Sequence, residues 1–379
     1  MKPVKLIKNL ENLDKSTWDV VRFGDVVREV KDVSRDPVSE GIERIIGLEH
    51  LNPLDIHIRT WGDTTNGTTF TKRFSKGQVL FGRRRAYQKK AVLADFDGIC
   101  SGDIIVMEAI KERLDSGLLP FLVHGDGFYN WAVSTSAGSL SPRTKFKSLA
   151  EYEFRLPPMD VQKKLAELLW AVDEAEEKYL ESKDRTASLR KAIFDELTSK
   201  KSYLKCLGDC LLLSKTKSVP PHNEERYIGL EHVDSGVFST DKFVISKNVA
   251  SVCNVFKKGH LLYSKLRPNL DKAVIATFDG VCTTELLVYG AKKDISLEYI
   301  LHHLHSDKFV AYAFSKGFGT KMPRISHKIL SDFKIYAPSH KEQLSILNKL
   351  TKLRETEMSL SKSFHSTRKL RDNLINSIF

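Results

Sequence analysis

Apolar residues recur at alternating spacings of three and four in two long stretches of the chain. This spacing is the heptad pattern of a helix that buries one face against another helix. Each stretch continues for ~35 residues, so each predicted helix would be about 50 Å long at 1.5 Å per residue. Both seams have polar positions in mid-helix, and we expect the two helices to pack on each other. The first seam comprises Leu165, Leu168, Val172, Ala175, Tyr179, Ser182, Thr186, Leu189 and Ile193, and the second comprises Ile346, Leu350, Leu353, Glu357, Leu360, Phe364, Thr367, Arg371, Leu374 and Ile378.

The residues ahead of each predicted helix follow a different pattern. Short runs rich in β-branched residues, such as AVLADF from Ala91 and AVIATF from Ala273, predict strands separated by Gly- and Asp-containing turns. Stretches with one apolar face, LLPFLVHGDGFYNWAV and LEYILHHLHSDKFVAYAF, predict helices. Each segment therefore predicts a globular α/β domain. At the starts of the long helices, Asp160 is a predicted N-cap, and Ser339 with Glu342 forms a predicted capping box.

The two halves of the chain repeat each other in near-constant register. Arg44–His50 reads RIIGLEH, and Arg226–His232 reads RYIGLEH 182 residues later. The same offset relates KAVLADFDGIC to KAVIATFDGVC and KGQVLF to KGHLLY. One residue is then lost, so that Pro142-Arg143 matches Pro323-Arg324 at an offset of 181. This period indicates a duplicated domain, because solenoid repeats are only about 20–50 residues long.

The chain thus has the order globule, helix, globule, helix. We predict globular domains at 1–157 and 202–338, and long helices at 158–201 and 339–379. The predicted fold class is α+β, with two pseudo-symmetric α/β globular domains separated by two long helices that form an antiparallel coiled coil. Antiparallel helices would place the globular domains at opposite ends of a rod. Because duplex DNA is itself pseudo-symmetric, such a protein could contact two separated sites in one duplex, with the helices as a ruler.

Composition narrows the class of protein. The formal charge of +12 and a pI near 9.3 favour a polyanionic partner, usually nucleic acid, although an ordinary basic protein is the alternative. The sequence has no apolar run of about 18 residues and no apolar N-terminal stretch typical of a signal peptide. The five cysteines form no CxxC pair, and we expect Cys100 and Cys282 to be small core residues. We therefore expect a reduced, cytoplasmic protein without a membrane partner.

Basic residues cluster in a loop at the same place in both halves. Arginine can read guanine edges and asparagine can read adenine, whereas lysine more often holds phosphate. The alternative is a solvated basic loop without a partner, which is less favoured because both copies carry cations at this place. The candidate DNA-binding residues of these loops are Arg83, Arg84, Arg85, Tyr87, Lys89 and Lys90 in the first half, and Lys265, Arg267, Asn269 and Lys272 in the second.

A second duplicated pair of segments reads SLSPRTKFK and TKMPRISHK. Each places Pro-Arg beside small polar residues and further cations, which fits phosphate binding. The alternative is that Pro-Arg marks only a rigid turn. The candidate DNA-binding residues here are Arg143, Lys145, Lys321, Arg324 and Lys328.

Two histidine-containing motifs are weaker candidates. The duplicated GLEH motif pairs Glu49 with His50 and Glu231 with His232, but on a strand the two side chains would point to opposite faces. The HHLH run from His302 has no counterpart in the first half, and we expect helical surface histidines rather than a metal site. The sequence contains no GxxxxGK[ST], HExxH or GxSxG motif, and no GxGxxG after a strand. We therefore predict no catalytic residues and no metal site.

The chain resembles the specificity subunits of type I restriction–modification systems over essentially its whole length. The resemblance rests on the duplicated globule–helix layout and on the segments LSPRTKFKSLAEYEFRLPPMDVQKKLAELL and MPRISHKILSDFKIYAPSHKEQLSIL. At the border between globule and helix this family has Pro-Pro followed by a Glu-Gln pair. Glu342-Gln343 matches that pair, whereas the first copy has Val161-Gln162 and the second has Ala337-Pro338 in place of the double proline.

The resemblance implies a non-catalytic protein whose two globular domains each recognise one half of a split double-stranded DNA target. It also implies that the long helices set the gap and dock two methyltransferase subunits, and that restriction subunits can join the complex. No cofactor would bind this chain itself, because S-adenosylmethionine would be bound by the partner methyltransferase.

Two other interpretations stay open at this point. One is an α/β enzyme dimerised by a coiled coil, which activity in the isolated chain would favour. The other is a scaffold or RNA-binding adaptor, which a preference for structured RNA over duplex DNA would favour. Neither alternative explains why both copies keep the same loop and the same helix.

Overall fold

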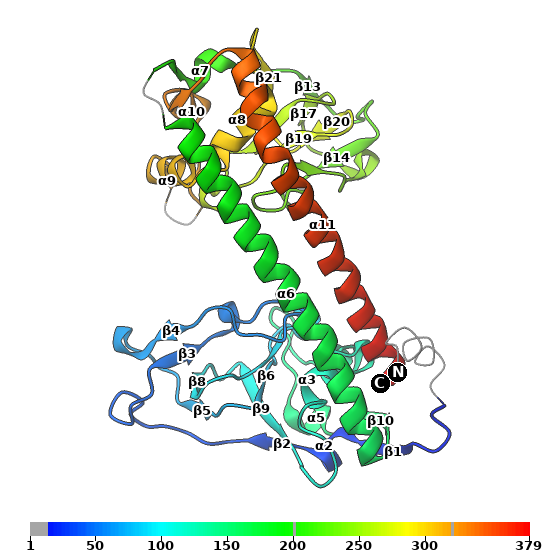
Figure 1. Cartoon of the computed structure of the whole chain (residues 1–379). Helices are drawn as coiled ribbons and strands as arrows, with labels where there is room; N and C mark the ends of the chain where they lie inside the picture. Colours follow the sequence, from blue (N-terminus) through cyan, green and yellow to red (C-terminus); the bar gives the residue numbers. More distant parts are fainter. Residues whose placement is uncertain (1–13, 200–201, 320–321) are drawn as a thin grey trace. The chain divides into compact units, whose positions relative to one another are not determined.

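The computed structural model describes residues 14–199, 202–319 and 322–379 (Figure 1). It contains two compact units, each built from one globular part and a portion of both long helices. Unit 1 comprises Met1–Leu180 and Ser361–Phe379, and unit 2 comprises Glu181–Leu360. The boundaries between the units thus fall within the two long helices, whereas we predicted each long helix as a separate segment.

Unit 1 contains three small sheets with the strand orders β1-β10, β2-β9-β6-β7 and β4-β3-β8-β5. All their strand pairs are antiparallel except β3 with β8, which is parallel. The strands are β1 Asp19–Arg22, β2 Val27–Val30, β3 Arg44–Ile46, β4 Gly62–Asp63, β5 Lys72–Phe74, β6 Val79–Gly82, β7 Ala91–Leu93, β8 Gly98–Cys100, β9 Ile104–Ala109 and β10 Glu153–Leu156. The helices are α2 Phe23–Val26, α3 Leu119–Leu122, α4 Asp126–Ser134, α5 Phe146–Leu149 and α6 Met159–Thr198, with short 3-10 turns η1 Leu48–His50, η2 Thr64–Asn66 and η3 Ala86–Gln88.

Unit 2 repeats this arrangement in the strand orders β11-β22, β12-β21-β18-β19-β15 and β13-β17-β20-β14-β16. The pair β14 with β20 is parallel, as is the equivalent pair in unit 1. The strands are β11 Leu204–Cys206, β12 Leu211–Leu213, β13 Lys217–Ser218, β14 Arg226–Ile228, β15 Ser239–Thr240, β16 Val244–Ile245, β17 Cys253–Phe256, β18 Leu261–Ser264, β19 Ala273–Ala276, β20 Gly280–Cys282, β21 Leu286–Ala291 and β22 Lys334–Tyr336. The helices are α7 Leu207–Cys210, α8 Leu297–Leu304, α9 Asp307–Ser315, α10 His327–Ser331 and α11 His340–Ile378, with 3-10 turns η4 Leu230–His232, η5 Ser246–Asn248 and η6 Pro268–Leu270.

The duplication seen in the sequence is therefore a duplication of structure. Equivalent positions form the cores of the two units: Phe81, Phe128 and Leu169 are buried in unit 1, as are Tyr263, Phe309 and Leu350 in unit 2. Cys100 and Cys282 are buried at equivalent places, which confirms the prediction that they are core residues. The two β-rich domains and the two long helices confirm the predicted α+β class.

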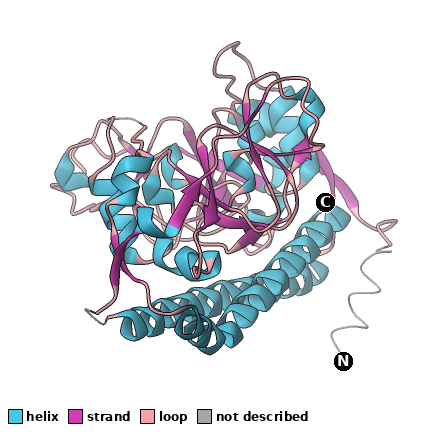
Figure 2. Cartoon of the chain, turned by 90° about the horizontal axis from the view of Figure 1, so that it is seen from above, coloured by secondary structure: helices cyan, strands magenta, loops and turns pink. Residues whose placement is uncertain are grey.

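The long helices α6 and α11 run antiparallel in both units. In unit 1, Leu165 near the start of α6 shares a core with Ile378 at the end of α11. In unit 2, Phe194 near the end of α6 shares a core with Ile346 near the start of α11. Figure 2 shows the two helices as the long cyan elements. The antiparallel pairing predicted from the heptad seams is confirmed.

The register of the first seam differs from the prediction. Leu189 was placed on the seam but is 51% exposed, whereas the neighbouring Arg190 and Phe194 are buried. The seam is not purely apolar, because a buried arginine occupies it in each unit. In unit 2, Arg190 Nε donates to Glu357 Oε1 at 2.7 Å.

The same ion pair recurs in unit 1 with the two helices exchanged. Arg371 of α11 pairs with Glu176 of α6 at 3.0 Å, whereas Arg190 of α6 pairs with Glu357 of α11. Arg371 follows Arg190 by 181 residues, and Glu357 follows Glu176 by the same offset. Each unit therefore contains one buried Arg–Glu pair between its own portions of α6 and α11.

A buried glutamine joins each globular part to the start of its long helix. The amide oxygen of Gln162 accepts from Asp115 N at 2.8 Å, and its amide nitrogen donates to Arg113 O and Pro157 O at 3.1 and 2.9 Å. Gln343 makes the same three bonds in unit 2, with Ser296 N, Asp294 O and Pro338 O. The glutamine of the border motif is thus a structural residue in both copies.

The predicted helix starts are right in position but differ in detail. Ser339 caps α11, because the backbone N of Glu342 donates to its Oγ at 3.4 Å. Asp160 is not an N-cap, since α6 already begins at Met159. Its carboxylate instead lies in the first turn, where the positive end of the helix dipole favours a negative charge.

Replacing Gln162 with Leu is expected to lower the free energy of unfolding of unit 1 by about 1–3 kcal/mol, because two buried carbonyls and one N–H lose their partners. Urea unfolding followed by tryptophan fluorescence measures this, since all four tryptophans, Trp18, Trp61, Trp131 and Trp170, belong to unit 1. Gln343→Leu is the matched control, because it disturbs unit 2 and leaves the tryptophan signal in place. An unchanged midpoint for Gln162→Leu would contradict the structural role.

Candidate nucleic-acid interface

Four segments that are distant in sequence meet at one end of the globular part of unit 1. The backbone N of Arg83 donates to Asp103 O at 2.9 Å, and that of Arg85 donates to Pro142 O at 2.8 Å. The Lys90 ammonium donates to Leu48 O at 2.7 Å. These contacts join the basic loop, the turn before β9, the Pro-Arg segment and the GLEH turn. We call this group of residues, 47–50, 83–90, 101–103 and 137–145, loop cluster 1.

Unit 2 builds the same group from the equivalent segments. The backbone N of Lys265 donates to Glu285 O at 3.0 Å, and that of Arg267 donates to Pro323 O at 2.7 Å. Lys272 Nζ donates to Leu230 O at 2.8 Å. We call residues 229–232, 265–272, 283–285, 318–319 and 322–328 loop cluster 2. The two basic segments that the sequence analysis singled out in each half therefore lie together.

Both basic loops carry a 3-10 turn between two residues in the left-handed region. Arg85 and Lys89 have φ of 54° and 50° in cluster 1, and Arg267 and Asp271 have φ of 50° and 47° in cluster 2. A non-glycine residue in this region costs about 1–3 kcal/mol, and such residues gather at ligand sites where surrounding structure holds them. Equivalent strain at four positions indicates that both units hold this loop in one defined shape.

The residue at the tip of the loop differs between the units. Tyr87 stands at the tip of cluster 1 and is 57% exposed, and Asn269 stands at the equivalent position of cluster 2 and is also exposed. Neither side chain makes a hydrogen bond or ion pair with another described residue. The two clusters thus present different chemistry on the same backbone frame.

Several predicted DNA-binding residues are engaged within the protein. Lys90 and Lys272 hold the GLEH turns, as described above. Arg143 Nε donates to Asp103 Oδ1 at 2.7 Å, and Arg324 Nε donates to the equivalent acid, Glu285, at 3.2 Å. The Arg143 guanidinium holds the pKa of the Asp103 carboxyl below its usual value. The Pro-Arg arginines therefore also serve as internal ties of the loop clusters.

Most of the remaining basic residues of the loop in cluster 1 also make hydrogen bonds or ion pairs within the protein. Arg83 Nε donates to Thr144 O at 3.0 Å, and Arg84 donates to Ser141 Oγ at 3.0 Å. Lys89 pairs with Asp126 of α4. The side chain of Arg85 is half-buried. These contacts orient the loop. The side chains of Arg83, Arg84, Arg85 and Lys89 nevertheless stay partly accessible to solvent.

Lys145, Arg267 and Lys328 are exposed, and their side chains have no ion pair within the part of the chain that the structure describes. Together with Tyr87 and Asn269 they are the candidate residues freest to contact a partner. Lys265 is half-buried at the start of its loop. Lys321, which was also predicted, lies outside the described residues.

The histidine run was predicted to lie on a helix surface, and that prediction is wrong. His302, His303 and His305 are buried, because their rings pack on aromatic residues such as Phe194 and Phe238. Burial lowers the pKa of His303 to about 3, so this ring is neutral.

The run also has a counterpart in the first half. His305 corresponds to His124 at the 181 offset, and both are buried histidines that bond to a backbone carbonyl, of Val237 and Ala91 respectively. No group of three or more His, Cys, Asp or Glu among the described residues could hold a metal ion.

The segment that follows the GLEH turn ties loop cluster 1 to the long helices in unit 1. His57 Nε2 lies 2.8 Å from Asp173 Oδ2, and Arg59 makes two 2.6 Å bonds to Glu177. The hydrogen bond to Asp173 raises the pKa of His57, and burial raises the pKa of Glu176 to about 7. None of these charged residues was singled out from the sequence, because their partners come from distant segments.

Unit 1 is expected to lose stability as the pH rises from 4.5 to 7. The folded pKa of Glu176 is raised from 4.5 to about 7, so the folded state binds more protons than the unfolded state in this window. His57 acts in the same direction, because the stabilisation from its raised pKa is lost as the pH rises through that value. Glu176→Gln should flatten the dependence of the tryptophan-monitored urea midpoint on pH.

The matched control for this prediction is Glu357→Gln, which removes the equivalent carboxylate from unit 2 and should keep the slope of unit 1. Equal slopes for wild type and Glu176→Gln between pH 4.5 and 7 would contradict the assignment.

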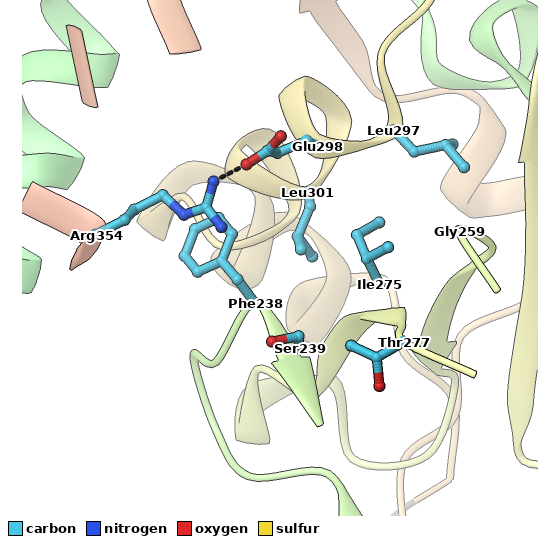
Figure 3. Close-up of a pocket in the computed structure, with 9 residues that line it drawn as sticks. All are labelled: Phe238, Ser239, Gly259, Ile275, Thr277, Leu297, Glu298, Leu301 and Arg354. Carbon is cyan, nitrogen blue, oxygen red and sulfur yellow. Dashed lines mark ion pairs between the residues drawn. The ribbon is translucent and has the colours of Figure 1, made fainter. Parts of the chain in front are cut away.

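Unit 2 has a cavity of about 330 Å³ at the place where unit 1 has this tie (Figure 3). Ser239 and Arg354 stand where unit 1 has His57 and Asp173. Arg354 pairs with Glu298 and packs over the Phe238 ring at 4.6 Å from its centroid. The titratable side chains that line the cavity are Arg354 and Glu298, which pair with each other.

The comparisons with known proteins agree with this architecture. Residues 15–183 match the family model of the type I restriction modification DNA specificity domain. The specificity subunit of the type I restriction enzyme EcoDI from Escherichia coli is 27% identical over 169 residues, which are 44% of this chain and 38% of that protein. The match therefore spans well under half of that relative.

Two solved structures resemble the whole chain in fold. The S subunit of a type I restriction-modification system from M. genitalium has a TM-score of 0.52 at 15% identity, over 97% of this chain and 96% of that one. A chain solved in a study of complex assembly and conformational transition of the type I R-M system has a TM-score of 0.50 at 18% identity, over 95% and 96%.

No helix within the described ranges is long and apolar enough to cross a membrane. The duplicated β-rich units, the antiparallel long helices and the match of the first unit to the family model are consistent with one another. Residues 15–183 of this chain thus match a type I restriction modification DNA specificity domain, and this part of the chain is similar in sequence to the specificity subunit of a type I restriction enzyme.

Proposed function

We propose that this chain recognises a bipartite sequence in double-stranded DNA, with loop cluster 1 contacting one half-site and loop cluster 2 contacting the other. One observation carries the proposal: the two clusters share a strained backbone frame but present different tip residues, Tyr87 and Asn269. A common frame suits the common shape of the DNA backbone. Different tips suit two different half-site sequences, because base edges are read by side-chain identity.

The net charge of +12 supports the same proposal, because phosphate contacts supply most of the affinity of a protein for DNA. Within the clusters, Lys145 and Lys328 are suited to phosphate. Arg267 is suited to guanine, and Asn269 is suited to adenine. The arginines tied to Asp103 and Glu285 position the loops.

The long helices are the proposed docking site for two methyltransferase subunits. Leu189 of α6 is 51% exposed, and Leu344 and Met358 of α11 are 43% and 52% exposed. Exposed apolar residues on a long helix suit a partner that covers them. The methyltransferase subunits would bind S-adenosylmethionine, restriction subunits would complete the complex, and the assembly would act in the cytoplasm, where the DNA is.

The experiment that tests this function is selection from a library of random duplex DNA by the chain in complex with its methyltransferase subunits. The expected result is enrichment of two short sequence blocks at a fixed gap, with binding that weakens steeply as salt rises. Absence of an enriched sequence, or stronger competition by structured RNA, would favour the RNA-adaptor alternative. Turnover of a small molecule by the isolated chain would favour the enzyme alternative.

We also propose that the long helices set the gap between the two half-sites. Inserting four residues at equivalent mid-helix positions of α6 and α11 would lengthen each helix by about 6 Å. Since DNA rises 3.4 Å per base pair along each strand, the preferred gap is expected to grow by about two base pairs. The same selection measures this change, and a gap unchanged by the insertion would contradict the role of the helices.

A further inference from the structure

The GLEH motif is identical in both halves and has the same structure in both. Residues Leu48–His50 and Leu230–His232 form 3-10 turns rather than the strand assumed from sequence. The preceding glycine donates its N–H to the histidine Nδ1 at 2.9 Å in each unit. The histidine of the motif is therefore a structural element of the turn, and its glutamate is left without an evident structural role.

The glutamate carboxylate occupies a defined position in each turn. A Cβ atom on Gly47 would overlap the carboxylate of Glu49, and one on Gly229 would overlap that of Glu231. The carboxylate therefore folds back over the glycine in both units.

These carboxylates face solvent as acceptors without donors. Glu49 and Glu231 are both exposed, and no described residue donates a hydrogen bond to either carboxylate. The nearest cationic group in unit 2 is the His232 ring, 3.9 Å away. An exposed carboxylate that accepts no hydrogen bond from a described residue is available to a donor on a ligand.

The position of the carboxylates restricts the identity of that ligand. Each GLEH turn belongs to a loop cluster, since Lys90 and Lys272 donate to the carbonyls of Leu48 and Leu230. A carboxylate repels phosphate, so it cannot help to hold the DNA backbone. It can accept a hydrogen bond from the exocyclic amino group of cytosine or adenine, which carboxylate side chains read at base edges.

We propose that Glu49 and Glu231 each accept a hydrogen bond from the exocyclic amino group of one base, at equivalent places in the two half-sites. The inference rests on the proposed function and adds a specificity determinant to it. The loop tips differ between the units, so they suit the bases that differ between the half-sites. The GLEH turns are identical, so they suit an amino-bearing base that both half-sites share.

The test maps methylated DNA motifs in cells that carry the complete system with Glu49→Ala or Glu231→Ala. Glu49→Ala is expected to relax the base requirement at one position of the first half-site by roughly 5- to 150-fold. Glu231→Ala is expected to do the same in the second half-site only. Glu43→Ala and Glu225→Ala are matched controls, because these exposed glutamates occupy equivalent positions just outside the clusters.

The possible results separate the inference from the function on which it rests. Motifs that stay unchanged in both variants would overturn the inference. Methylation that falls at all sites without a change of motif would also overturn it, since it would assign the glutamates to a partner protein. A wild-type system without any split motif would instead refute the proposed function.

Discussion

Arg371→Glu is expected to lower the free energy of unfolding of unit 1 by about 3–5 kcal/mol, which is the usual cost of breaking a buried ion pair. The Arg371 and Glu176 side chains are each only 3% exposed and lie 3.0 Å apart. The substitution would place a second carboxylate against Glu176 and would remove the donor to Leu54 O. Tryptophan-monitored urea unfolding is the measurement, because it reports on unit 1.

Two control variants make this prediction specific. The double variant Glu176→Arg/Arg371→Glu exchanges the two charges and restores an ion pair. It should therefore recover part of the lost free energy of unfolding of unit 1. Arg190→Glu breaks the equivalent pair in unit 2 and should leave the tryptophan transition in place. A loss in Arg371→Glu that the exchange does not reduce at all would contradict the importance of the pair.

Arg267→Ala and Asn269→Ala are expected to relax sequence preference in the second half-site while the first half-site stays unchanged. Each lost bidentate base contact would cost about 1–3 kcal/mol of discrimination, roughly 5- to 150-fold. Both side chains are exposed at the tip of loop cluster 2 and make no contact that the fold needs. Competition binding with duplexes that carry single base changes measures the effect.

The matched variant in the other unit is Tyr87→Ala, which removes the tip side chain at the equivalent position of cluster 1. It should alter only the first half-site. If Arg267→Ala weakened binding to every duplex equally, Arg267 would be a phosphate contact, and its role in base recognition would be refuted.

Much of the architecture could be predicted because the sequence contains two copies of the same domain. The near-constant offset revealed the duplicated domain, and the heptad spacing revealed both long helices. The structure confirms these two features. The predicted seam was wrong at Leu189, because the neighbouring Arg190 is the buried residue. An arginine interrupts the apolar pattern from which the seam was predicted. Its partner Glu357 is 167 residues away, and a single sequence does not show which distant charges pair.

The candidate site, too, could be predicted from the sequence only in part. Sequence comparison of the halves located both basic loops and both Pro-Arg segments, and the structure brings them together. It could not show that Arg143 and Arg324 are tied to acids, because Asp103 and Glu285 lie about 40 residues away in sequence. The equivalent placement of these two acids in the repeat was the available signal. Burial of His302 depends on Phe194 and Phe238, which likewise come from distant segments.

The proposed function requires that the two loop clusters, which carry different tip residues, recognise the two halves of one split DNA target. Comparison of the methylated bases in the genome of the host with and without this gene tests it most directly. We expect one split methylated motif that is present with the gene and absent without it. A methylation pattern that is identical in both strains, or one that changes at a single continuous motif, would contradict recognition of a split target by this protein.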